Sequence, residues 1–202
     1  MKKRVIFIAS SVKNSLSCVA AIDVESKRFL RVVADRSGSA INWRDYEVKG
    51  LSGNLLKNLP FLAKIKVLDK VPLNYQQENV LIDKKIEYIR RVSLSELEEY
   101  VNYPKSLWGE GGYVKYYNDL KMKYSLFLIK VDKIKLYWKD RGSYSPQRRG
   151  VFRYNGIVYD LPLTDPAFEY LEEEILRDRY LIISLGEPFN DKCYKILAKV
   201  FK

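Results

Sequence analysis

Three lysines and one tyrosine alternate along a segment in the second half of the chain. Lys133, Lys135, Tyr137 and Lys139 have the same parity, so they share one face if the segment is a strand. The basic residues that follow are Arg141, Arg148 and Arg149. Cations interleaved with a tyrosine suit a phosphate backbone whose bases stack on aromatic rings. Lysines on an outward strand face also prevent edge-to-edge pairing, so that structural interpretation stays open beside the binding one.

The charge of the whole chain favours binding. Its 202 residues include 36 Lys and Arg against 25 Asp and Glu, a net charge of +11 at pH 7. The surplus is concentrated, because residues 101–150 contain eleven Lys or Arg and four Asp or Glu, whereas residues 151–202 contain seven and nine. Polyanions such as nucleic acids are therefore expected partners.

A second polar element consists of Gln76, Gln77, Glu78 and Asn79. Gln and Asn side chains read base edges, and Glu accepts from an exocyclic amine or binds a metal through its oxygens. A polar connection that only turns the chain has the same composition. Both interpretations are kept.

The sequence contains no histidine, which excludes Ser-His-Asp and Cys-His catalysis and histidine-held zinc or haem. The two cysteines, Cys18 and Cys193, lie far apart and form no CxxC, so zinc knuckles and iron–sulfur clusters are excluded as well. We expect two separate buried thiols in a reducing cytoplasm. No cofactor and no metal site is predicted.

Signals for catalysis are few. Ser10 and Lys13 have the S-x-x-K spacing of a Ser–Lys nucleophile, but the companion S-D-N and K-T-G elements are missing. Walker, G-x-S-x-G and dinucleotide-binding patterns are missing too. Two carboxylates, Glu78 and Asp165, remain as acid–base groups, although Asp165 directly before Pro166 also fits a helix N-cap. No catalytic residue is assigned, and a non-catalytic role is preferred.

Short apolar runs rich in Val, Ile and Phe, with 13% aromatic residues, favour a mainly β fold. In the first half we expect strands over residues 5–9, 18–24, 29–34 and 62–68. The segments 18–24 and 29–34 form a hairpin. The other expected elements are a loop with one short helix (36–60), an irregular polar segment (72–83) and a helix with a capping box (93–101).

In the second half, residues 124–139 are too long for one flat strand. Their apolar phase slips, which predicts a bulge near Asp132. Asn155-Gly156 predicts a type I′ hairpin turn. The remaining expected elements are a helix that opens at 164–166 and carries the acidic run 172–174, and strands over 180–185 and 193–201.

Each half thus has about five strands and one helix, the inventory of a small Greek-key barrel such as the oligonucleotide-binding (OB) fold. We predict two tandem OB-like barrels, over residues 1–102 and 103–202. One larger mixed α/β domain is the alternative, because strand order is not encoded in a single sequence.

Nothing in the sequence predicts export or membrane insertion. The start MKKRVIFIA begins like a signal peptide, but its apolar run ends at Ser10. No stretch approaches the roughly 18 apolar residues that span a bilayer. A cytoplasmic location is expected, and the oligomeric state stays open.

Several segments, taken in order, carry a family resemblance. They are residues 8–13 (IASSVK), 18–22 (CVAAI), 77–79 (QEN), 148–156 (RRGVFRYNG), 164–166 (TDP), 184–189 (SLGEPF) and 193–195 (CYK). Together they resemble the prokaryotic dual OB-containing domain family, from about Lys3 to Phe201. The resemblance implies two tandem barrels and nucleic-acid binding in a modification or defence setting, and it transfers no catalytic set.

Two sets of site residues follow. The predicted nucleic-acid contacts are Lys13, Gln77, Asn79, Lys133, Lys135, Tyr137, Lys139, Arg141, Arg148 and Arg149. A hypothetical site between the two barrels, drawn from the family resemblance, comprises Ser11, Lys13, Glu78, Asn79, Arg149, Asp165 and Tyr194.

Three functions remain in competition. The first is an auxiliary nucleic-acid-binding module, with single strands preferred because a barrel groove and many tyrosines suit unstacked bases. The second is a carboxylate-dependent enzyme on nucleotides or nucleic acid, in which Glu78 or Asp165 holds a hard metal or moves a proton. The third is a scaffold whose basic surface meets an acidic protein.

Overall fold

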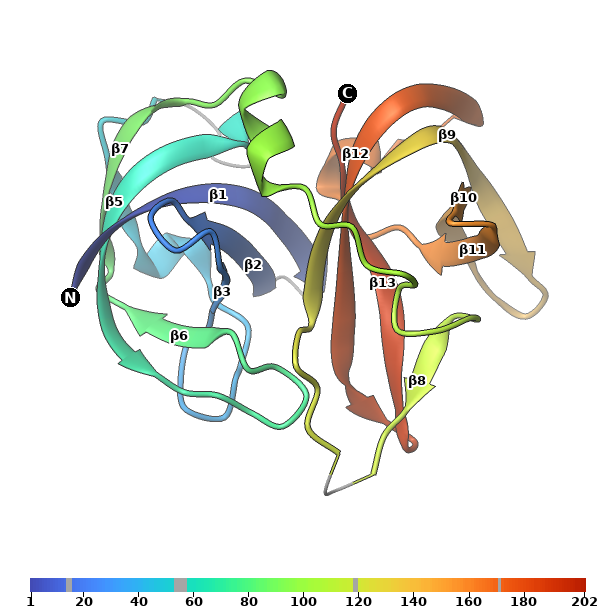
Figure 1. The fold of residues 1–202 in the computed structure, drawn as a ribbon, viewed down its shortest axis with the longest axis horizontal. Coiled ribbons are helices and arrows are strands. Elements are labelled where there is room, and N and C mark those ends of the chain that lie inside the picture. The colour runs from blue at the N-terminus through green and yellow to red at the C-terminus, as the bar shows by residue number, and fades with distance from the viewer. Residues whose placement is uncertain (14–15, 53–57, 118–119, 171) are drawn as a thin grey trace. The chain divides into compact units, whose positions relative to one another are not determined.

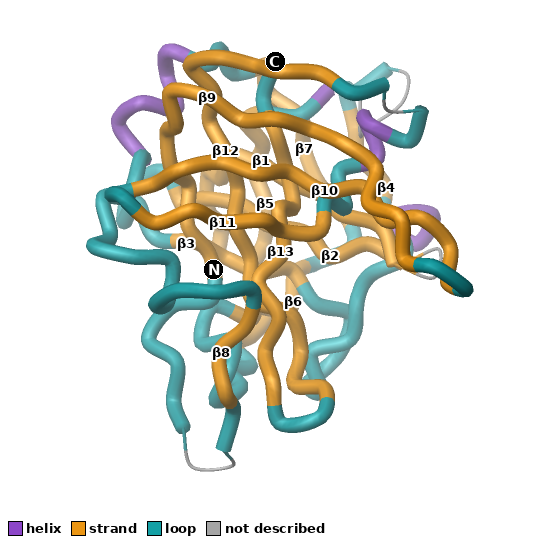
Figure 2. Tube along the Cα trace, turned by 90° about the vertical axis from the view of Figure 1, so that its right-hand side faces the viewer, coloured by secondary structure: helices purple, strands orange, loops and turns teal. Residues whose placement is uncertain are grey.

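The computed structural model describes residues 1–13, 16–52, 58–117, 120–170 and 172–202, with only the backbone of residues 12 and 13. Within these residues strands dominate, and the helices are short 3-10 segments (Figure 2). The predicted mainly β class is confirmed. Two compact units are present: unit 1 comprises Met1–Tyr100 and Lys121–Ser125, and unit 2 comprises Val101–Leu120 and Leu126–Lys202. The division at residues 102 and 103 stays a prediction for the domain organisation.

Unit 1 is built around a closed barrel. Its strands are β1 (Lys2–Lys13), β2 (Leu16–Asp23), β3 (Phe29–Val32), β4 (Glu47–Lys49), β5 (Phe61–Lys70), β6 (Asn79–Ile82) and β7 (Lys85–Arg91). They are ordered β1-β2-β3-β6-β5-β7-β4 (Figure 1). Because β1 pairs with β5 as well as with β2, the strands β1, β2, β3, β6 and β5 close into a barrel. This five-stranded Greek-key arrangement, with β3 parallel to β6, confirms the predicted OB-like fold.

Strand alternation fills the barrel of unit 1. In β5, Ala63, Ile65 and Val67 are buried, whereas Lys64 and Lys66 are exposed, as the sequence predicts. The rings of Phe7 and Phe61 stack with their centroids 5.0 Å apart in the core. The predicted hairpin over 18–34 is confirmed by the antiparallel β2–β3 pairing.

Two predictions for unit 1 need correction or refinement. The segment 72–83 is not wholly irregular, because β6 pairs with both β3 and β5 and completes the barrel. A strand of four residues that begins with Asn79 gives too short an alternation to be found from sequence. Between residues 36 and 60, the described part contains the 3-10 helix η1 (Trp43–Asp45) and β4, and residues 53–57 lie outside it.

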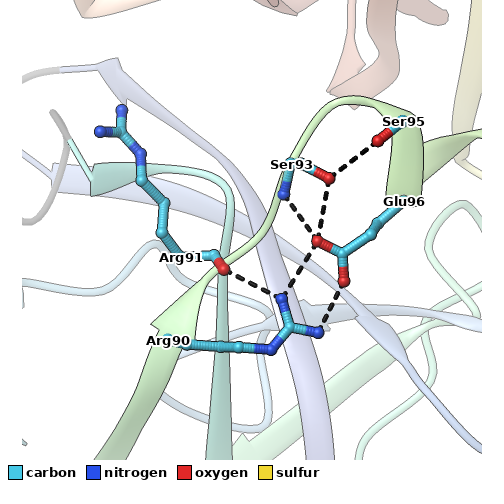
Figure 3. Close-up of polar contacts among 5 residues, drawn as sticks. All are labelled: Arg90, Arg91, Ser93, Ser95 and Glu96. Atoms are coloured by element: carbon cyan, nitrogen blue, oxygen red, sulfur yellow. Dashed lines mark hydrogen bonds and ion pairs between the residues drawn. The ribbon is translucent and has the colours of Figure 1, made fainter.

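The predicted capping box is present before the 3-10 helix η3 (Ser95–Tyr100). Glu96 Oε2 accepts hydrogen bonds from the backbone N–H and the hydroxyl of Ser93, each at 2.9 Å (Figure 3). The guanidinium of Arg90 donates to both carboxylate oxygens, at 3.1 and 2.6 Å. The end of β7 is thereby tied to the start of the helix.

Unit 2 is one sheet that curves into a half-barrel. Its strands are β8 (Tyr113–Lys115), β9 (Leu126–Arg141), β10 (Tyr144–Tyr154), β11 (Ile157–Pro162), β12 (Glu174–Phe189) and β13 (Lys192–Val200), ordered β11-β10-β9-β12-β13-β8. An isolated bridge between Leu163 and Leu197 brings the chain after β11 back to β13. The concave side is filled by a core that includes Ile134, Leu136 and Tyr159.

The Asn155-Gly156 turn is confirmed. Both residues have positive φ, 47° and 81°, and Tyr154 pairs with Ile157 across the turn from β10 to β11. A type I′ turn requires positive φ at both of its central positions.

The phase slip in β9 is real, but its cause differs from the prediction. Val131 and Ile134 are both buried although their parities differ. No residue is inserted, because Val131 pairs with Arg179 and Lys133 with Arg177 in one unbroken register with β12. The distortion is shared by the partner strand, where Asp178 has a φ of 52°. The predicted bulge is therefore absent, and the irregularity at this point is the positive φ of Asp178 on β12.

The helix predicted after Thr164 is much shorter than expected. The 3-10 helix η4 (Pro166–Phe168) begins at the predicted N-cap, Asp165, whose side chain accepts from Ala167 N at 3.0 Å. Residues 172–174 do not continue it, since Glu174 already begins β12 and pairs with Leu136. The pairing of β12 with β9 outweighs the helical preference of the acidic run.

Candidate nucleic-acid interface

The alternating segment of β9 lies on the outer face of unit 2. Ile134 and Leu136 point into the core, whereas the residues that alternate with them along β9 point outward. The outward residues are Lys133, Lys135, Tyr137 and Lys139. Lys133 and Lys139 are exposed, and Lys135 and Tyr137 are half-buried. The structure therefore brings these four predicted contacts together on one face.

Neighbouring strands extend this face, because paired residues point to the same side of a sheet. On β10, Gln147 pairs with Lys139 and Arg149 pairs with Tyr137. On β12, Arg177 pairs with Lys133. Arg153 of β10 has the same parity as Arg149 and pairs with Val158 of β11. We call the set Lys133, Lys135, Tyr137, Lys139, Gln147, Arg149, Arg153 and Arg177 the basic face.

Asp160 of β11 organises one corner of the basic face. Its carboxylate accepts from Arg149 Nε at 2.7 Å and from the Tyr137 hydroxyl at 2.9 Å. Arg149 also donates to Gln147 Oε1 at 2.7 Å. Burial and the hydrogen bond to Asp160 raise the pKa of Tyr137. Arg149 thus serves mainly to fix this corner, since its charge is already neutralised.

Other cations of the face keep their charge available. Lys133, Arg153 and Arg177 form no ion pair with a carboxylate in the described part of the chain, and all three are exposed. Lys135 has an exposed partner, Glu173, at 3.1 Å, and such surface pairs contribute little. The face therefore presents a surplus of positive charge.

Of the two remaining predicted contacts of unit 2, Arg148 lies on the opposite face, whereas Arg141 continues the parity of Lys139 on β9. Arg148 of β10 pairs with Trp138 of β9, so its side chain points to the face opposite that of Arg149. Its guanidinium donates to the backbone carbonyl of Asp165 at 3.2 Å. Arg141 is exposed at the end of β9, where its guanidinium lies 5.3 Å from the ring centre of Tyr144. Arg141 is thus exposed, whereas Arg148 is half-buried.

Two arginines of the basic face, Arg153 and Arg177, were not predicted from the sequence. The position of Arg153 could have been predicted, because it follows Arg149 by four residues in the strand that leads into the Asn155-Gly156 turn and therefore shares its face. The position of Arg177 could not have been predicted, since β12 starts six residues before the strand that was expected to begin at residue 180. Its position depends on pairing with Lys133, a contact between distant segments.

The predicted contacts in unit 1 have mixed accessibility. Gln77 is exposed in the β5–β6 connection, and its amide donates to Leu73 O at 2.8 Å. Asn79 is fully buried, 3.5 Å from Gln76 Oε1. The side chain of Lys13 lies outside the described residues, and Ser11 is half-buried on β1. Asn79 thus cannot read a base without opening of the barrel.

Glu78 is part of an internal polar link of unit 1. Its carboxylate accepts from Ser125 N at 2.6 Å and from Ser125 Oγ at 2.9 Å. The same hydroxyl accepts from Arg31 Nη2 at 3.1 Å. Ser125 and Arg31 are buried. These contacts hold residues 121–125 to the barrel.

Asp165 and Tyr194 belong to unit 2 and have different environments. Asp165 is buried, and its carboxylate accepts from Val200 N at 3.1 Å and from Lys199 Nζ at 3.2 Å in addition to its capping bond. Tyr194 is exposed on β13, opposite Tyr113. The hypothesis of a site between the barrels stays a hypothesis.

The structure also places the two cysteines in different units, Cys193 buried and Cys18 half-buried. Within the described ranges, no three His, Cys, Asp or Glu side chains gather as metal ligands. No helix among the described residues is long and apolar enough to cross a membrane.

Unit 1 has a second basic surface that the sequence analysis did not identify. On its outer side, Lys2 of β1 pairs with Lys66 of β5, and Arg4 pairs with Lys64. Like charges directly opposite each other destabilise a sheet. The repulsion at Lys64 is reduced by an ion pair with Glu87, whose carboxylate lies 3.1 Å from the Lys64 ammonium. This surface is the natural comparison for the basic face of unit 2.

Comparisons with known proteins agree with this architecture. Neither the search of curated proteins nor the search of solved structures gave a match. A family described as the dual OB-containing domain matches residues 3–200, which include both units almost completely. The closed barrel of unit 1, the curved sheet of unit 2 and this match together show that the chain belongs to the dual OB-containing domain family.

Proposed function

We propose that this chain is a nucleic-acid-binding module without catalysis of its own, that it prefers single strands, and that the basic face of unit 2 holds the phosphate backbone. The observation that carries the proposal is the charge of that face. Its cations are Lys133, Lys135, Lys139, Arg149, Arg153 and Arg177, and the carboxylates paired with them are Asp160 and Glu173.

The spacing of the cations supports a backbone contact. Successive outward residues of β9 stand about 6.6 Å apart along the strand, so they form a row rather than a point charge. Arg177 of β12 pairs with Lys133, and Arg153 of β10 directly follows Phe152, which pairs with Ile134, so both arginines extend the row across the strands. A flexible polyanion can follow such a row, and each phosphate contact releases counterions. Membership of an OB family supports the same conclusion, because OB folds commonly bind oligonucleotides.

The carboxylate enzyme has less support. Both oxygens of Glu78 accept hydrogen bonds from Ser125, and Asp165 is occupied by a helix cap and by Lys199. Each carboxylate therefore already has a structural role in its own unit. A scaffold that binds an acidic protein would use the same face. The binding experiment below distinguishes this function from nucleic-acid binding.

The test is fluorescence anisotropy of labelled single-stranded DNA, RNA and duplex DNA over a series of KCl concentrations. The wild type should bind with an affinity that falls linearly on a log–log salt plot. The triple variant Lys133→Gln, Arg153→Gln, Arg177→Gln should bind more weakly. Its salt slope should be smaller by about 2, because each phosphate contact to a single strand contributes ~0.7.

The matched control removes three charges from unit 1, through Lys2→Gln, Arg4→Gln and Lys66→Gln. It should keep most of the affinity and the slope. Absence of binding by the wild type at the lowest salt overturns the proposal. Equal losses in both triple variants would show a general charge effect and overturn the assignment to the basic face.

A further inference from the structure

A separate aromatic patch lies at the edge of unit 2, on the β8–β13 ladder. Tyr113 pairs directly with Tyr194, and two residues along the ladder Lys115 pairs directly with Lys192. Because paired residues and residues two apart share a face, the two rings and the two ammonium groups point to the same side. Figures 1 and 2 both show β8 beside β13. The ring centroids of the tyrosines are 5.9 Å apart.

The rings are accessible. Tyr113 and Tyr194 keep 41% and 40% of their surface, and Phe189 of β12, which pairs with Lys192 on the same face, keeps 66%. Beside Tyr194, β12 carries Gly186, where a Cβ would meet Ile196 Cδ1 at 3.3 Å and Tyr194 O at 3.5 Å. Gly186 itself thus adds no side chain over Ile196 and Tyr194. Three large aromatic surfaces are thus open to solvent near one another.

Two lysines of the patch lie close together, and the one carboxylate that shares the parity of Phe189 on β12, Glu187, forms no ion pair with either in the described part of the chain. Lys115 and Lys192 are directly opposite, an arrangement that costs free energy in a sheet. Neither lysine forms an ion pair with any carboxylate that the structure describes. The ammonium of Lys192 instead lies 4.5 Å from the ring centre of Tyr113. An anion bound here would relieve the repulsion, which favours an anionic ligand over a neutral or cationic one.

The patch is also firmly held. Lys195 of β13 donates to the carbonyls of Gly109, Glu110 and Gly111 at 2.7, 3.0 and 2.9 Å, which fixes the loop that leads into β8. Lys195 N donates to Gly112 O at 2.8 Å. At the other end of β8, Tyr116 N donates to Asp191 O at 2.8 Å. Little ordering of the rings is therefore needed when a ligand binds.

We propose that Tyr113, Tyr194 and Phe189 form a stacking platform for unpaired bases, with Lys115 and Lys192 at the adjoining phosphates. The proposal rests on the proposed nucleic-acid binding and gives it a physical basis for single-strand preference. A ring stacks on any exposed base face, whereas the bases of a duplex are already stacked on one another. The platform therefore contributes to binding of single strands and not to binding of duplexes.

The test uses the full chain and compares the wild type with the double variant Tyr113→Leu, Tyr194→Leu. The probes are oligo(dT), a duplex of the same length and inorganic polyphosphate, which has charge and no bases. Stacking on an aromatic side chain typically accounts for ~5- to ~150-fold in affinity per base. We expect the double variant to lose about tenfold in affinity for oligo(dT). Its affinities for the duplex and polyphosphate should stay unchanged.

A matched control, Tyr103→Leu with Tyr170→Leu, removes two tyrosines that are 77% and 92% exposed outside the platform. It should bind all three probes like the wild type, and Tyr113→Phe with Tyr194→Phe should restore binding of oligo(dT). Photocrosslinking of the wild type to an oligonucleotide with 5-bromodeoxyuridine should label Tyr113, Tyr194 or Phe189. This measurement does not depend on whether the double variant folds.

The outcomes separate the two proposals. Unchanged oligo(dT) affinity in the double variant, or crosslinks confined to the basic face, overturns the platform and leaves the proposed function intact. Equal losses for oligo(dT) and polyphosphate also overturn it, because they show a loss of charge contacts or of folding. Failure of the wild type to bind any probe overturns the proposed function itself.

Discussion

The ammonium group of Lys195 lies 2.7 Å from the carbonyl oxygen of Gly109, although 86 positions separate the two residues in the sequence. The side chain is fully buried, and it also lies 5.3 Å from the ring centre of Tyr159. Tyr159 in turn donates its hydroxyl to Gly109 O at 3.0 Å and accepts from Leu107 N at 3.0 Å. A lysine and a tyrosine thus fix an irregular loop onto the sheet of unit 2.

Replacement of Lys195 by methionine should destabilise unit 2. Methionine fills a similar volume but cannot donate to the carbonyl oxygens of Gly109, Glu110 and Gly111. We expect the free energy of unfolding to fall by about 2 kcal/mol, since hydrogen bonds from a charged donor contribute ~1.5–3 kcal/mol. Urea unfolding followed by tryptophan fluorescence and circular dichroism measures the change. The control is Lys133→Met, at an exposed position of β9. A loss no larger than that of the control contradicts a stabilising role for the Lys195 clamp, the three hydrogen bonds from Lys195 to the carbonyls of Gly109, Glu110 and Gly111.

Because of the same lysine, we expect the free energy of unfolding to depend on pH in the alkaline range. Burial lowers the pKa of Lys195 from 10.5 to about 8. Between these values the unfolded chain binds more protons at this site than the folded chain, so the contribution of Lys195 to the free energy of unfolding rises with pH. The difference in stability between the wild type and Lys195→Met should therefore increase from about pH 8 to about pH 10.5. A difference that stays constant over this range would show that the lysine keeps an ordinary pKa.

Because of Glu96, we expect the stability of the fold to depend on pH in the acidic range. The hydrogen bonds from Arg90 and from Ser93 lower the pKa of Glu96 from 4.5 to about 2 (Figure 3). A carboxyl whose pKa is lowered by folding stabilises the fold above its unfolded pKa and loses that contribution as the pH falls through the folded one. Glu96→Gln should therefore reduce stability at neutral pH, and this effect should disappear as the pH falls below about 2. NMR titration of the Glu96 carboxyl, with Glu99 as the exposed comparison, measures the pKa directly.

Local patterns predicted the parts of this fold that local physics decides. Asn155-Gly156 specifies its turn through the backbone, the alternation of Ala63, Ile65 and Val67 specifies a strand with one buried face, and Asp165 specifies a cap. Each of these signals lies within a few residues of the element that it determines. The row of Lys133, Lys135 and Lys139 was predicted on one face for the same reason.

Features that join distant segments were not predictable in this way. Arg177 reaches Lys133 only through the β12–β9 register, and Tyr113 meets Tyr194 only because a three-residue strand, too short to show a period, pairs with β13. The Lys195 clamp has no sequence signature, because its acceptors are backbone carbonyls. Glu78 was recognised as unusual, but its partner, Ser125, lies 47 positions away.

Asp165→Asn should destabilise unit 2 although it is nearly isosteric. The carboxylate serves three donors, Ala167 N, Lys199 Nζ and Val200 N, so an amide group in its place must direct N–H toward one of them. It also leaves the buried ammonium of Lys199 without its counter-charge. We expect a loss of about 3 kcal/mol in the free energy of unfolding. Glu172→Gln, at an exposed position, is the control, and equal stability of the two variants would refute a structural role for Asp165.

Ser125→Ala should weaken the attachment of residues 121–125 to the barrel of unit 1. The hydroxyl donates to Glu78 Oε2 and accepts from Arg31 Nη2, so its removal breaks the hydroxyl link between the buried Arg31 and the half-buried Glu78. We expect a loss of about 2 kcal/mol, measured by urea unfolding, against a negligible effect of Ser52→Ala at an exposed position. The double variant with Glu78→Gln should lose less than the sum of the single losses, because both substitutions break the same link. Additive losses would instead show that Ser125 and Glu78 act independently, and that the carboxylate is free for another role.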